Sequence, residues 1–411
     1  MFRARCSNGQ DIFLKHPCWS KSSLTKMRDN YTFNCLSCDE EVVLKLGERQ
    51  AWHFSHRQNS LCSERHHCNE SADHKAAKLE VYRWLESYKL EPKIEHYLED
   101  LRQRPDVYVK INDRKLVLEL QRSYLNRGHF LKRYFSYKDH GYETIWIGVL
   151  KKPIRRARHY YALSHVDSLL IRPFPFPYAI YFSLTARKWM IFSDFFYVTP
   201  RKTFVRVTPI PLTISPHCLF FNPEVHLTET KKDKNNRMKE YLTVWKRQTM
   251  KARTALHYSL TKTERNVLQL LQRYKMPLNY FPALCNIPLS SQYACNNAPY
   301  LWQTWLVIMY INNKGLGEAF SLSQLTQWFL DNQAKAGFSF RLSVLHLKQH
   351  IRVLLNDYLD VLCYFNVLEK ISPGSYKLIH AITINKSFQT LLGDDTYIMS
   401  QLVIYFENKN N

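Results

Sequence analysis

The sequence predicts a multidomain protein with a mixed α/β fold. The chain has 411 residues, which is more than a single ordinary hydrophobic core accommodates. Between residues 69 and 150, apolar residues at helical spacing give way to strand-like runs, then to a second helical stretch and a buried strand. That order is typical of a mixed sheet flanked by helices. Residues 254–385 show mainly helical patterns, so a helix-rich C-terminal domain is also expected.

We expect five segments along the chain, each with its own composition. The α/β core lies between a Cys- and His-rich start and a part that is first strand-rich, then strongly basic, then helical. The segments are a small Cys/His module (1–58), the α/β core (59–152), a strand-rich extension (153–230), a basic linker or helix (231–253) and a helical C-terminal domain (254–411).

Within the C-terminal domain, helices are predicted at Leu322–Leu330 and Leu345–Phe365. A β-hairpin follows at 368–379, with its turn at Ser372-Pro373-Gly374-Ser375. Helices followed by a hairpin is the order of a winged helix, although other helical domains also end in a hairpin. The C-terminal domain is therefore expected to be helix-rich, with a winged helix as one form it can take.

The composition is globular and strongly basic. Hydrophobic residues form 45% of the chain and charged residues 23%, while 58 Lys and Arg against 35 Asp and Glu give a net charge of +23. Such a field attracts polyanions, so DNA is the first candidate partner and an anionic membrane surface the second. Because the chain contains no apolar run as long as a membrane span and no apolar leader after Met1, we expect a cytoplasmic protein without an integral membrane segment.

Cysteine and histidine pairs in the first 68 residues predict a structural zinc site. Cys35 and Cys38 form a C-x2-C pair, and His53 and His56 form an H-x2-H pair. Two thiolates and two imidazoles suit tetrahedral Zn²⁺, and thiols beside histidines in a reducing compartment favour metal over disulfides. The alternative is two buried thiols with unrelated surface histidines. Replacement ligands are available nearby: Cys62, His66, His67 and Cys68.

Two acids interrupt apolar strands in the α/β core. If Asn112-Asp113 is a two-residue hairpin loop, counting back along the strands places Asp106 directly opposite Glu119. Directly opposed side chains lie about 5 Å apart, so their charges repel unless a cation lies between them. A hard divalent ion, Mg²⁺ or Mn²⁺, is the cation that carboxylates prefer. The alternative is a hairpin with ordinary solvent-facing acids.

The helix before this hairpin offers a third acid. Glu70, His74 and Lys78 recur at four-residue steps and so share one face. We predict phosphodiester hydrolysis assisted by a metal that Asp106 and Glu119 hold, with help from Glu70. Gln121, on the same strand face as Glu119, is expected to orient the attacking water. Lys78 or Arg104 is expected to stabilise the charge that develops on phosphate.

These residues, in this order, resemble the competence protein CoiA family. The matching positions are Glu70, Ser71, His74 and Lys78 on the helix, Asp106, Glu119, Gln121 and Ser123 on the strands, and Arg133, Tyr137 and Trp146 beyond them. The Cys35, Cys38, His53 and His56 set resembles the zinc-ribbon-like module that precedes the nuclease-like domain in that family. The resemblance implies a restriction-endonuclease-like (PD-(D/E)XK) fold and a role in natural transformation, on incoming single-stranded DNA and its recombination. It makes Glu70, Asp106 and Glu119 the acids of the site, and we assign DNA contacts to His74, Arg104, Ser123, Arg133 and Tyr137.

Two functions remain open from the sequence. The first is a metal-dependent nuclease. The second is a non-catalytic DNA-binding adaptor that hands single strands to a recombinase or to other competence proteins. Gln121 stands where the wider nuclease superfamily usually has a lysine, and a neutral amide cannot replace that cation, which favours the second function. A membrane-surface protein of the uptake machinery is a weaker third hypothesis.

Overall fold

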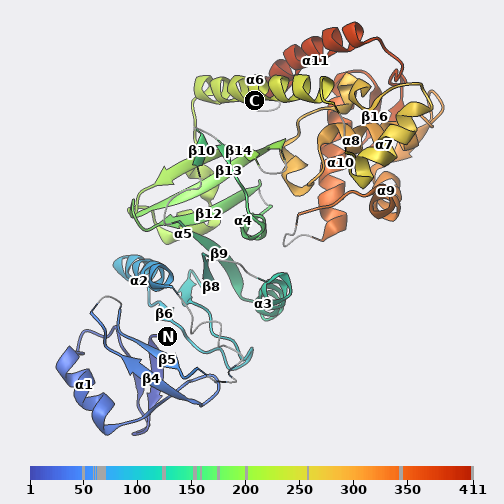
Figure 1. Ribbon diagram of the computed structural model, residues 1–411. Helices are drawn as coiled ribbons and strands as arrows, with labels where there is room; N and C mark the ends of the chain where they lie inside the picture. The colour runs from blue at the N-terminus through green and yellow to red at the C-terminus, as the bar shows by residue number, and fades with distance from the viewer. Residues whose placement is uncertain are drawn as a thin grey trace. The chain divides into compact units, whose positions relative to one another are not determined.

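The computed structural model describes residues 1–48, 51–58, 60, 62, 71–122, 126–150, 155–157, 160–173, 176–199, 202–256, 259–341 and 346–408. The chain forms two compact units (Figure 1). Unit 1 comprises Met1–Pro153, Ala179–Ile191 and Thr208–Leu227. Unit 2 comprises Ile154–Tyr178, Phe192–Val207 and Thr228–Asn411.

The first part of unit 1 is a five-stranded antiparallel sheet with one helix, α1 (Lys21–Asn30). The strand order is β2-β1-β3-β4-β5. Alternate residues of the strands are buried, as in β4, where Val42 and Leu44 face the small core. The strands are β1 (Arg3–Cys6), β2 (Asp11–Phe13), β3 (Phe33–Asn34), β4 (Glu41–Lys45) and β5 (His53–His56).

The predicted α/β core begins with helix α2 (Ala72–Ser87), whose N-cap Ser71 accepts a hydrogen bond from the His74 amide. Strand β6 (Lys93–Ile94) and the antiparallel hairpin of β7 (Val107–Ile111) and β8 (Arg114–Gln121) follow. The hairpin loop is Asn112-Asp113, and both residues have positive φ, as a type I′ turn requires. Ile111 pairs with Arg114, so the predicted register is confirmed.

Helix α3 (Arg127–Asp139) connects β8 to the parallel strand β9 (Glu143–Leu150), which confirms the predicted order of helix, hairpin, helix and strand. The strands of the predicted extension join the same sheet rather than a separate one. The order of the nine strands is β10-β11-β14-β13-β12-β9-β8-β7-β6. The added elements are β10 (Arg155–Ala157), β11 (Tyr160–Tyr161), α4 (His165–Leu170), β12 (Tyr178–Ser183), β13 (Lys188–Thr199), β14 (Lys202–Ile210) and α5 (Pro216–Phe221).

Within unit 1, aromatic packing holds α2 against this added part of the sheet. The Trp84 ring meets Trp189 edge-on at 4.8 Å and Phe220 at 5.6 Å between ring centroids. Its indole Nε1 donates to the Leu212 carbonyl at 2.9 Å. The helix that carries the predicted site residues is therefore anchored to the sheet by residues more than a hundred positions later in the chain.

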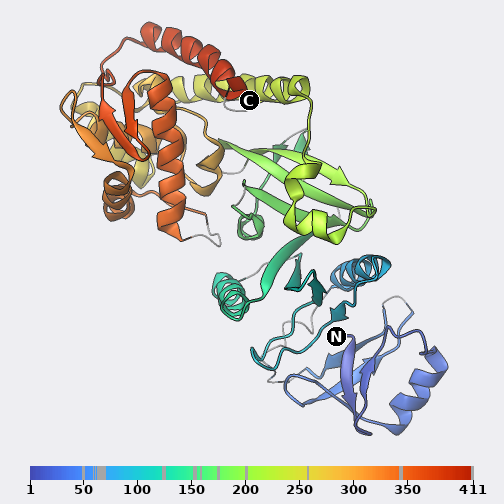
Figure 2. The same ribbon diagram turned by 180° about the vertical axis from the view of Figure 1, so that it is seen from behind.

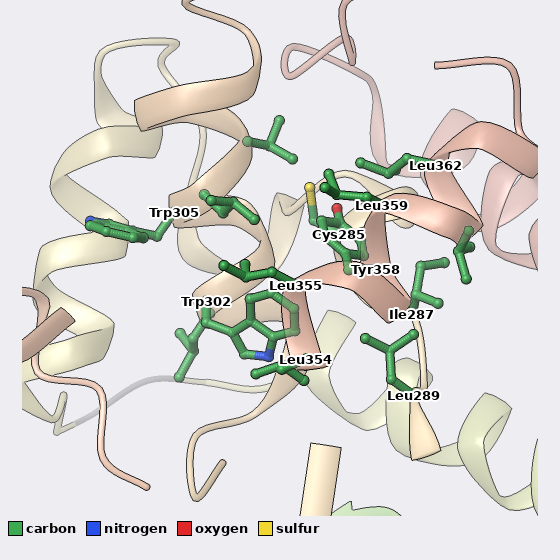
Figure 3. Close-up of a cluster of buried hydrophobic side chains, with 14 of the residues drawn as sticks. Cys285, Ile287, Leu289, Trp302, Trp305, Leu354, Leu355, Tyr358, Leu359 and Leu362 are labelled. Atoms are coloured by element: carbon green, nitrogen blue, oxygen red, sulfur yellow. The ribbon is translucent and has the colours of Figure 1, made fainter. Parts of the chain in front are cut away.

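Unit 2 is mainly helical. Around Trp302, which is fully buried, pack Tyr358, Leu354 and Leu355 of one helix, and the Trp302 Nε1 donates to Gln292 Oε1 at 2.8 Å (Figure 3). The predicted helices and hairpin of this part are confirmed, and the basic segment 231–253 is one continuous helix. The elements are α6 (Lys231–Arg253), α7 (Lys262–Gln272), α8 (Pro299–Leu306), β15 (Ala319–Ser321), α9 (Leu322–Ala336), α10 (Leu347–Tyr364), β16 (Leu368–Ser372), β17 (Ser375–Leu378) and α11 (Phe388–Asn408).

Among the helices of the described residues, none combines the length and the apolar character needed to cross a bilayer.

Candidate active site and metal-ligand cluster

Four metal-binding side chains converge in the N-terminal module. Cys35 and Cys38 lie in the turn between β3 and β4, His56 ends β5, and Cys62 follows a few residues later. One ligand atom from each lies within 4.8 Å of those from the other three, and Cys38 Sγ is 3.3 Å from His56 Nε2. This is the only such group of His, Cys, Asp and Glu in the part of the chain that the structure describes.

The cluster differs from the predicted ligand set at one position, where Cys62 takes the place of His53. His53 and His56 are three residues apart in β5, and side chains at odd spacing in a strand point to opposite faces. His56 pairs with Val42 on the inner face, whereas the His53 Nδ1 lies 2.9 Å from the Ala51 carbonyl. The spare ligand Cys62 completes the group, and the other spares, His66, His67 and Cys68, lie outside the described residues.

The electrostatics of this cluster suit a metal ion. Burial raises the pKa of the Cys38 thiol, and the neighbouring thiols Cys62 and Cys35 raise it further, against a backbone hydrogen bond at Glu40 that lowers it. Burial also lowers the pKa of His56, which keeps the imidazole neutral and able to ligate. Three thiols and one imidazole in a compact group are a donor set typical of structural zinc, so the residues present fit such an ion.

Asp106 is buried immediately before β7, with only 2% of its surface exposed. Its Oδ2 accepts a hydrogen bond from the Leu120 amide of β8 at 2.8 Å. Its Oδ1 is 2.8 Å from the Lys78 Nζ and 3.3 Å from the His74 Nε2, and both of these side chains come from α2. The carboxylate of Asp106 is therefore held between the sheet and α2 by an ion pair and a backbone amide.

Glu119 is also buried, in the middle of the sheet on β8. Its partners come from the other helix, because Arg133 of α3 forms a short ion pair with Glu119 Oε1 and the Tyr137 hydroxyl donates to the same oxygen at 2.8 Å. Arg133 Nη2 also donates to the Arg104 carbonyl at 3.1 Å, two residues before Asp106. The two acids thus lie at the same end of the β7–β8 hairpin, and each is held by its own set of partners.

A third acid, Glu95, joins this cluster and was not identified from the sequence. It is 2% exposed, its Oε1 accepts a hydrogen bond from Lys78 Nζ at 2.9 Å, and its Oε2 accepts one from the Phe2 amide. Lys78 is fully buried between Glu95 and Asp106. No motif surrounds Glu95, and the only signal was an acid directly after the short strand Lys93–Ile94.

The predicted site residues fall into three groups. Glu70 and Ser123 lie outside the described residues. His74, Asp106, Glu119, Lys78, Arg104, Arg133 and Tyr137 lie in or beside the buried cluster, and Gln121 is the half-buried last residue of β8. Lys78, Arg104 and Tyr137 are at most 1% exposed, so their geometry favours holding the acids over touching a substrate. The repulsion argument for a metal also needs correction, because Lys78 and Arg133 already supply a cation to each acid.

These features define a protein that joins a Cys/His module, an α/β domain with buried carboxylates and a helical domain. Family models describe the same three parts. The N-terminal domain of competence protein CoiA matches residues 16–65, its nuclease-like domain matches 70–225, and its C-terminal domain matches 239–392. The chain belongs to the competence protein CoiA family.

A curated relative supports the same family over nearly the whole chain. Competence protein CoiA of Bacillus subtilis (strain 168) is 23% identical over 366 residues, which are 88% of this chain and 94% of the relative. No solved structure matches the chain. The nuclease-like match runs from residue 70, within the predicted α/β core, to residue 225, within the strand-rich extension, in agreement with the single sheet that contains strands of both segments.

Proposed function

We propose that this protein is a metal-dependent nuclease that processes incoming DNA, chiefly single strands, during natural transformation. The observation that carries the proposal is the pair of buried acids, Asp106 and Glu119, at one end of the central hairpin of the nuclease-like domain. Burying two carboxylates costs free energy even when each is paired, so ordinary surface acids do not account for them. The name of the Bacillus subtilis relative supports a role in competence.

In this proposal, Asp106 and Glu119 would hold Mg²⁺ or Mn²⁺, with Glu70 as the helix acid. When bound, such an ion supplies Lewis acidity to a phosphodiester. Lys78 and Arg133 hold the two carboxylates in place through ion pairs. His74, whose side chain is 14% exposed, and Gln121 are the groups beside the acids that can reach a substrate or orient water. The Cys35, Cys38, His56 and Cys62 group would hold structural Zn²⁺.

The alternative is a non-catalytic DNA-binding adaptor that delivers strands to a recombinase or another competence protein. Two observations favour it. Gln121 supplies no cation where related nucleases use lysine, and the acids are neutralised by Lys78 and Arg133 without any metal. Both functions suit a cytoplasmic location, because the structure shows no disulfide among the described cysteines, as in a reducing compartment.

Two finer features of the fold are also proposed. The β7–β8 hairpin, with α3 leading to the parallel strand β9, supports a restriction-endonuclease-like core. In unit 2, the chain order α8, β15, α9, α10, β16, β17 and the sheet order β15-β17-β16 support a winged-helix arrangement, in which the first strand pairs with the last.

The test compares cleavage and binding for the wild-type protein and for Glu119→Gln. Labelled single- and double-stranded DNA is incubated with and without Mn²⁺, and DNA binding is measured by fluorescence anisotropy in EDTA. For a nuclease, we expect Mn²⁺-dependent cleavage that Glu119→Gln slows by roughly 100-fold or more, with the Kd changed less than about twofold. Melting curves check that both proteins are folded.

The matched control is Glu99→Gln, which neutralises an exposed acid of the same domain and should cleave like the wild type. Cleavage that persists unchanged in Glu119→Gln, or that needs no metal, would exclude this site. If the wild type binds DNA tightly but cleaves nothing in any metal, the adaptor function is correct.

A further inference from the structure

Helix α6 (Lys231–Arg253) has an inner face that the protein core fully occupies. Its 23 residues span about 34 Å. Tyr241 and Trp245 are buried, and they donate hydrogen bonds to the Tyr197 carbonyl at 3.1 Å and to the Asn286 carbonyl at 3.1 Å. Figures 1 and 2 show α6 as a long, straight helix with α11 beside it. The apolar side of α6 is therefore used within unit 2.

The outer face of α6 carries a row of exposed cations, which we call the α6 stripe. It consists of Lys232, Lys239, Lys246, Arg247 and Lys251. The first three are seven residues apart, so they lie on one face about 10.5 Å from one another. Among the described residues, none of the five forms an ion pair with an acid.

The buried cations of the same helix behave differently. Arg237 pairs with Glu229 and Asp194, both at 2.8 Å, and Arg253 pairs with Asp395 at 2.9 Å. The helix thus compensates the charges that it buries and leaves the charges that it exposes uncompensated. Like charges along one helix face destabilise it slightly, and a polyanion placed against the stripe would remove that repulsion.

The side chains around the stripe indicate which polyanion it fits best: a lipid surface, the bases of a single strand, or a nucleic-acid backbone. A membrane-bound amphipathic helix inserts an apolar face into the lipid, but the apolar face of α6 lies in the core of unit 2. A surface that binds single strands by their bases offers aromatic rings for stacking, but Tyr241 and Trp245 both point inward. What remains is a row of three lysines about 21 Å long, with Arg247 and Lys251 to one side of it, and this arrangement fits the phosphates of a nucleic-acid backbone.

We propose that the α6 stripe is a DNA-backbone binding surface of unit 2, independent of sequence and additional to the carboxylate cluster. The proposal rests on the proposed function only in that the protein meets DNA, and it holds for a nuclease and for an adaptor alike. Its role is to retain the strand by charge, whatever happens to the strand in the nuclease-like domain. The stripe binds phosphates and reads no bases.

The face of α10 is a weaker candidate for the same role. Its exposed cations Lys348 and Arg352 already contact Gln327 and Ser323 of α9. The same helix carries the acids Asp357 and Asp360, so its net charge is close to neutral. Charge complementarity to phosphate therefore favours α6 over α10.

The test neutralises part of the stripe in the full-length protein, through the triple variant Lys239→Gln, Lys246→Gln, Arg247→Gln. The matched control neutralises three exposed cations of helix α7 and its end: Lys262→Gln, Arg265→Gln, Arg273→Gln. Binding of labelled DNA of about 30 nucleotides, single-stranded and duplex, is measured by anisotropy over a range of KCl concentrations.

We expect the stripe variant to bind DNA at least about tenfold more weakly than the wild type. We also expect a slope of log Kd against log salt that is lower by about 2 to 3, because each lost phosphate contact reduces this slope by about 0.7 to 0.9. The α7 control should keep the wild-type slope. A stripe variant with the slope of the control would overturn the proposal. So would a variant that keeps DNA binding but loses binding to phosphatidylserine vesicles, because the stripe would then contact membranes.

The outcomes separate this proposal from the proposed function. If the wild type binds and cleaves DNA but the stripe variant behaves like the control, only the α6 proposal is wrong. If the stripe variant binds weakly yet cleaves saturating DNA at the wild-type rate, both proposals stand and the two surfaces act separately. If the wild type binds no DNA, both proposals are wrong.

Discussion

Two clusters in unit 1 show opposite ways to bury chemically active groups. The N-terminal cluster gathers Cys35, Cys38, His56 and Cys62 within 4.8 Å, and burial and the neighbouring thiols raise the pKa of Cys38. The carboxylate cluster buries Asp106, Glu95 and Glu119 and places Lys78 or Arg133 directly on each of them. The first cluster is a donor set that suits a metal ion, whereas each acid of the second cluster is paired with a cation of the chain itself.

The difference teaches where a metal is required and where it is optional. Thiolates without a nearby cation are stable in a buried site only when a metal ion replaces their protons. Carboxylates that are paired with Lys and Arg fold without a metal, so any Mg²⁺ or Mn²⁺ there serves chemistry rather than folding. Loss of zinc should therefore unfold part of the protein, whereas loss of magnesium should not.

The largest expected effect is on the N-terminal module. If the cluster holds zinc as proposed, Cys62→Ser or a strong chelator removes an ion whose binding contributes on the order of 10 kcal/mol to folding in small zinc modules. We expect one equivalent of zinc by elemental analysis of the wild type, none in the variant, and loss of protection of β3–β5 in hydrogen exchange. His53→Ser is the control and should keep its zinc, because His53 lies outside the cluster. Zinc loss in His53→Ser but not in Cys62→Ser would restore the sequence-based ligand set.

A smaller effect is expected when the internal cation of the second cluster is removed. Lys78→Met leaves Asp106 and Glu95 buried without their shared cation, which typically costs about 3 to 5 kcal/mol. Urea unfolding measures the free energy of unfolding, with Lys138→Met, an exposed lysine of α3, as the control within about 0.5 kcal/mol. Equal stability of the two variants would show that Lys78 does not neutralise these acids. Added Mg²⁺ that rescues Lys78→Met would show that a metal can take its place.

The smallest effect concerns His350 of α10, a buried titratable group whose pKa is shifted by burial. Burial lowers its pKa from 6.5 to about 4. Its Nε2 has no hydrogen-bond partner among the described residues. Between pH 6.5 and 4, His350 is therefore mostly protonated in the unfolded chain but mostly neutral in the folded chain. Stability is complete above pH 6.5 and falls as the pH drops toward 4, by about 2 kcal/mol at pH 5.

Thermal or urea unfolding at pH 7.5 and pH 5 measures this loss. His350→Phe removes the titrating group, so the difference in stability between the two pH values should shrink by about 2 kcal/mol relative to the wild type. An unchanged pH dependence in the variant would show that other groups cause it. The comparison then has three members: a site that needs a metal, a site with its own cations, and a site that stays neutral.

Much of the fold follows from local sequence patterns. The alternation of apolar residues and the loop Asn112-Asp113 predicted the β7–β8 hairpin and its register from Val107 opposite Leu118 to Ile111 opposite Arg114. The helices α2, α3, α9 and α10 followed from three- and four-residue spacing. These features depend on interactions between residues close in the chain, so the sequence carries them directly.

Two groups of residues depended on the tertiary structure. Cys62 replaces His53 in the cluster for two reasons. His53 and His56 point to opposite faces of β5, and the chain after β5 brings Cys62 close to Cys35, Cys38 and His56. Glu95 and the Phe2 amide join the site from opposite parts of unit 1, and Arg133 reaches Glu119 only because α3 packs beside β8 and β9. Local sequence patterns do not predict these contacts between distant residues, because the contacts depend on how separate helices and strands pack.

By itself, the sequence determined the order of elements, the hairpin register and the family to which the chain belongs. Only the tertiary structure decided which cation pairs with each acid and which cations on α6 are exposed, without an acidic partner among the described residues. The physical reason is the distance along the chain over which each kind of interaction acts. Backbone hydrogen bonds and side-chain periodicity act between near neighbours, whereas the pairing of buried charges is settled between distant segments when the core closes.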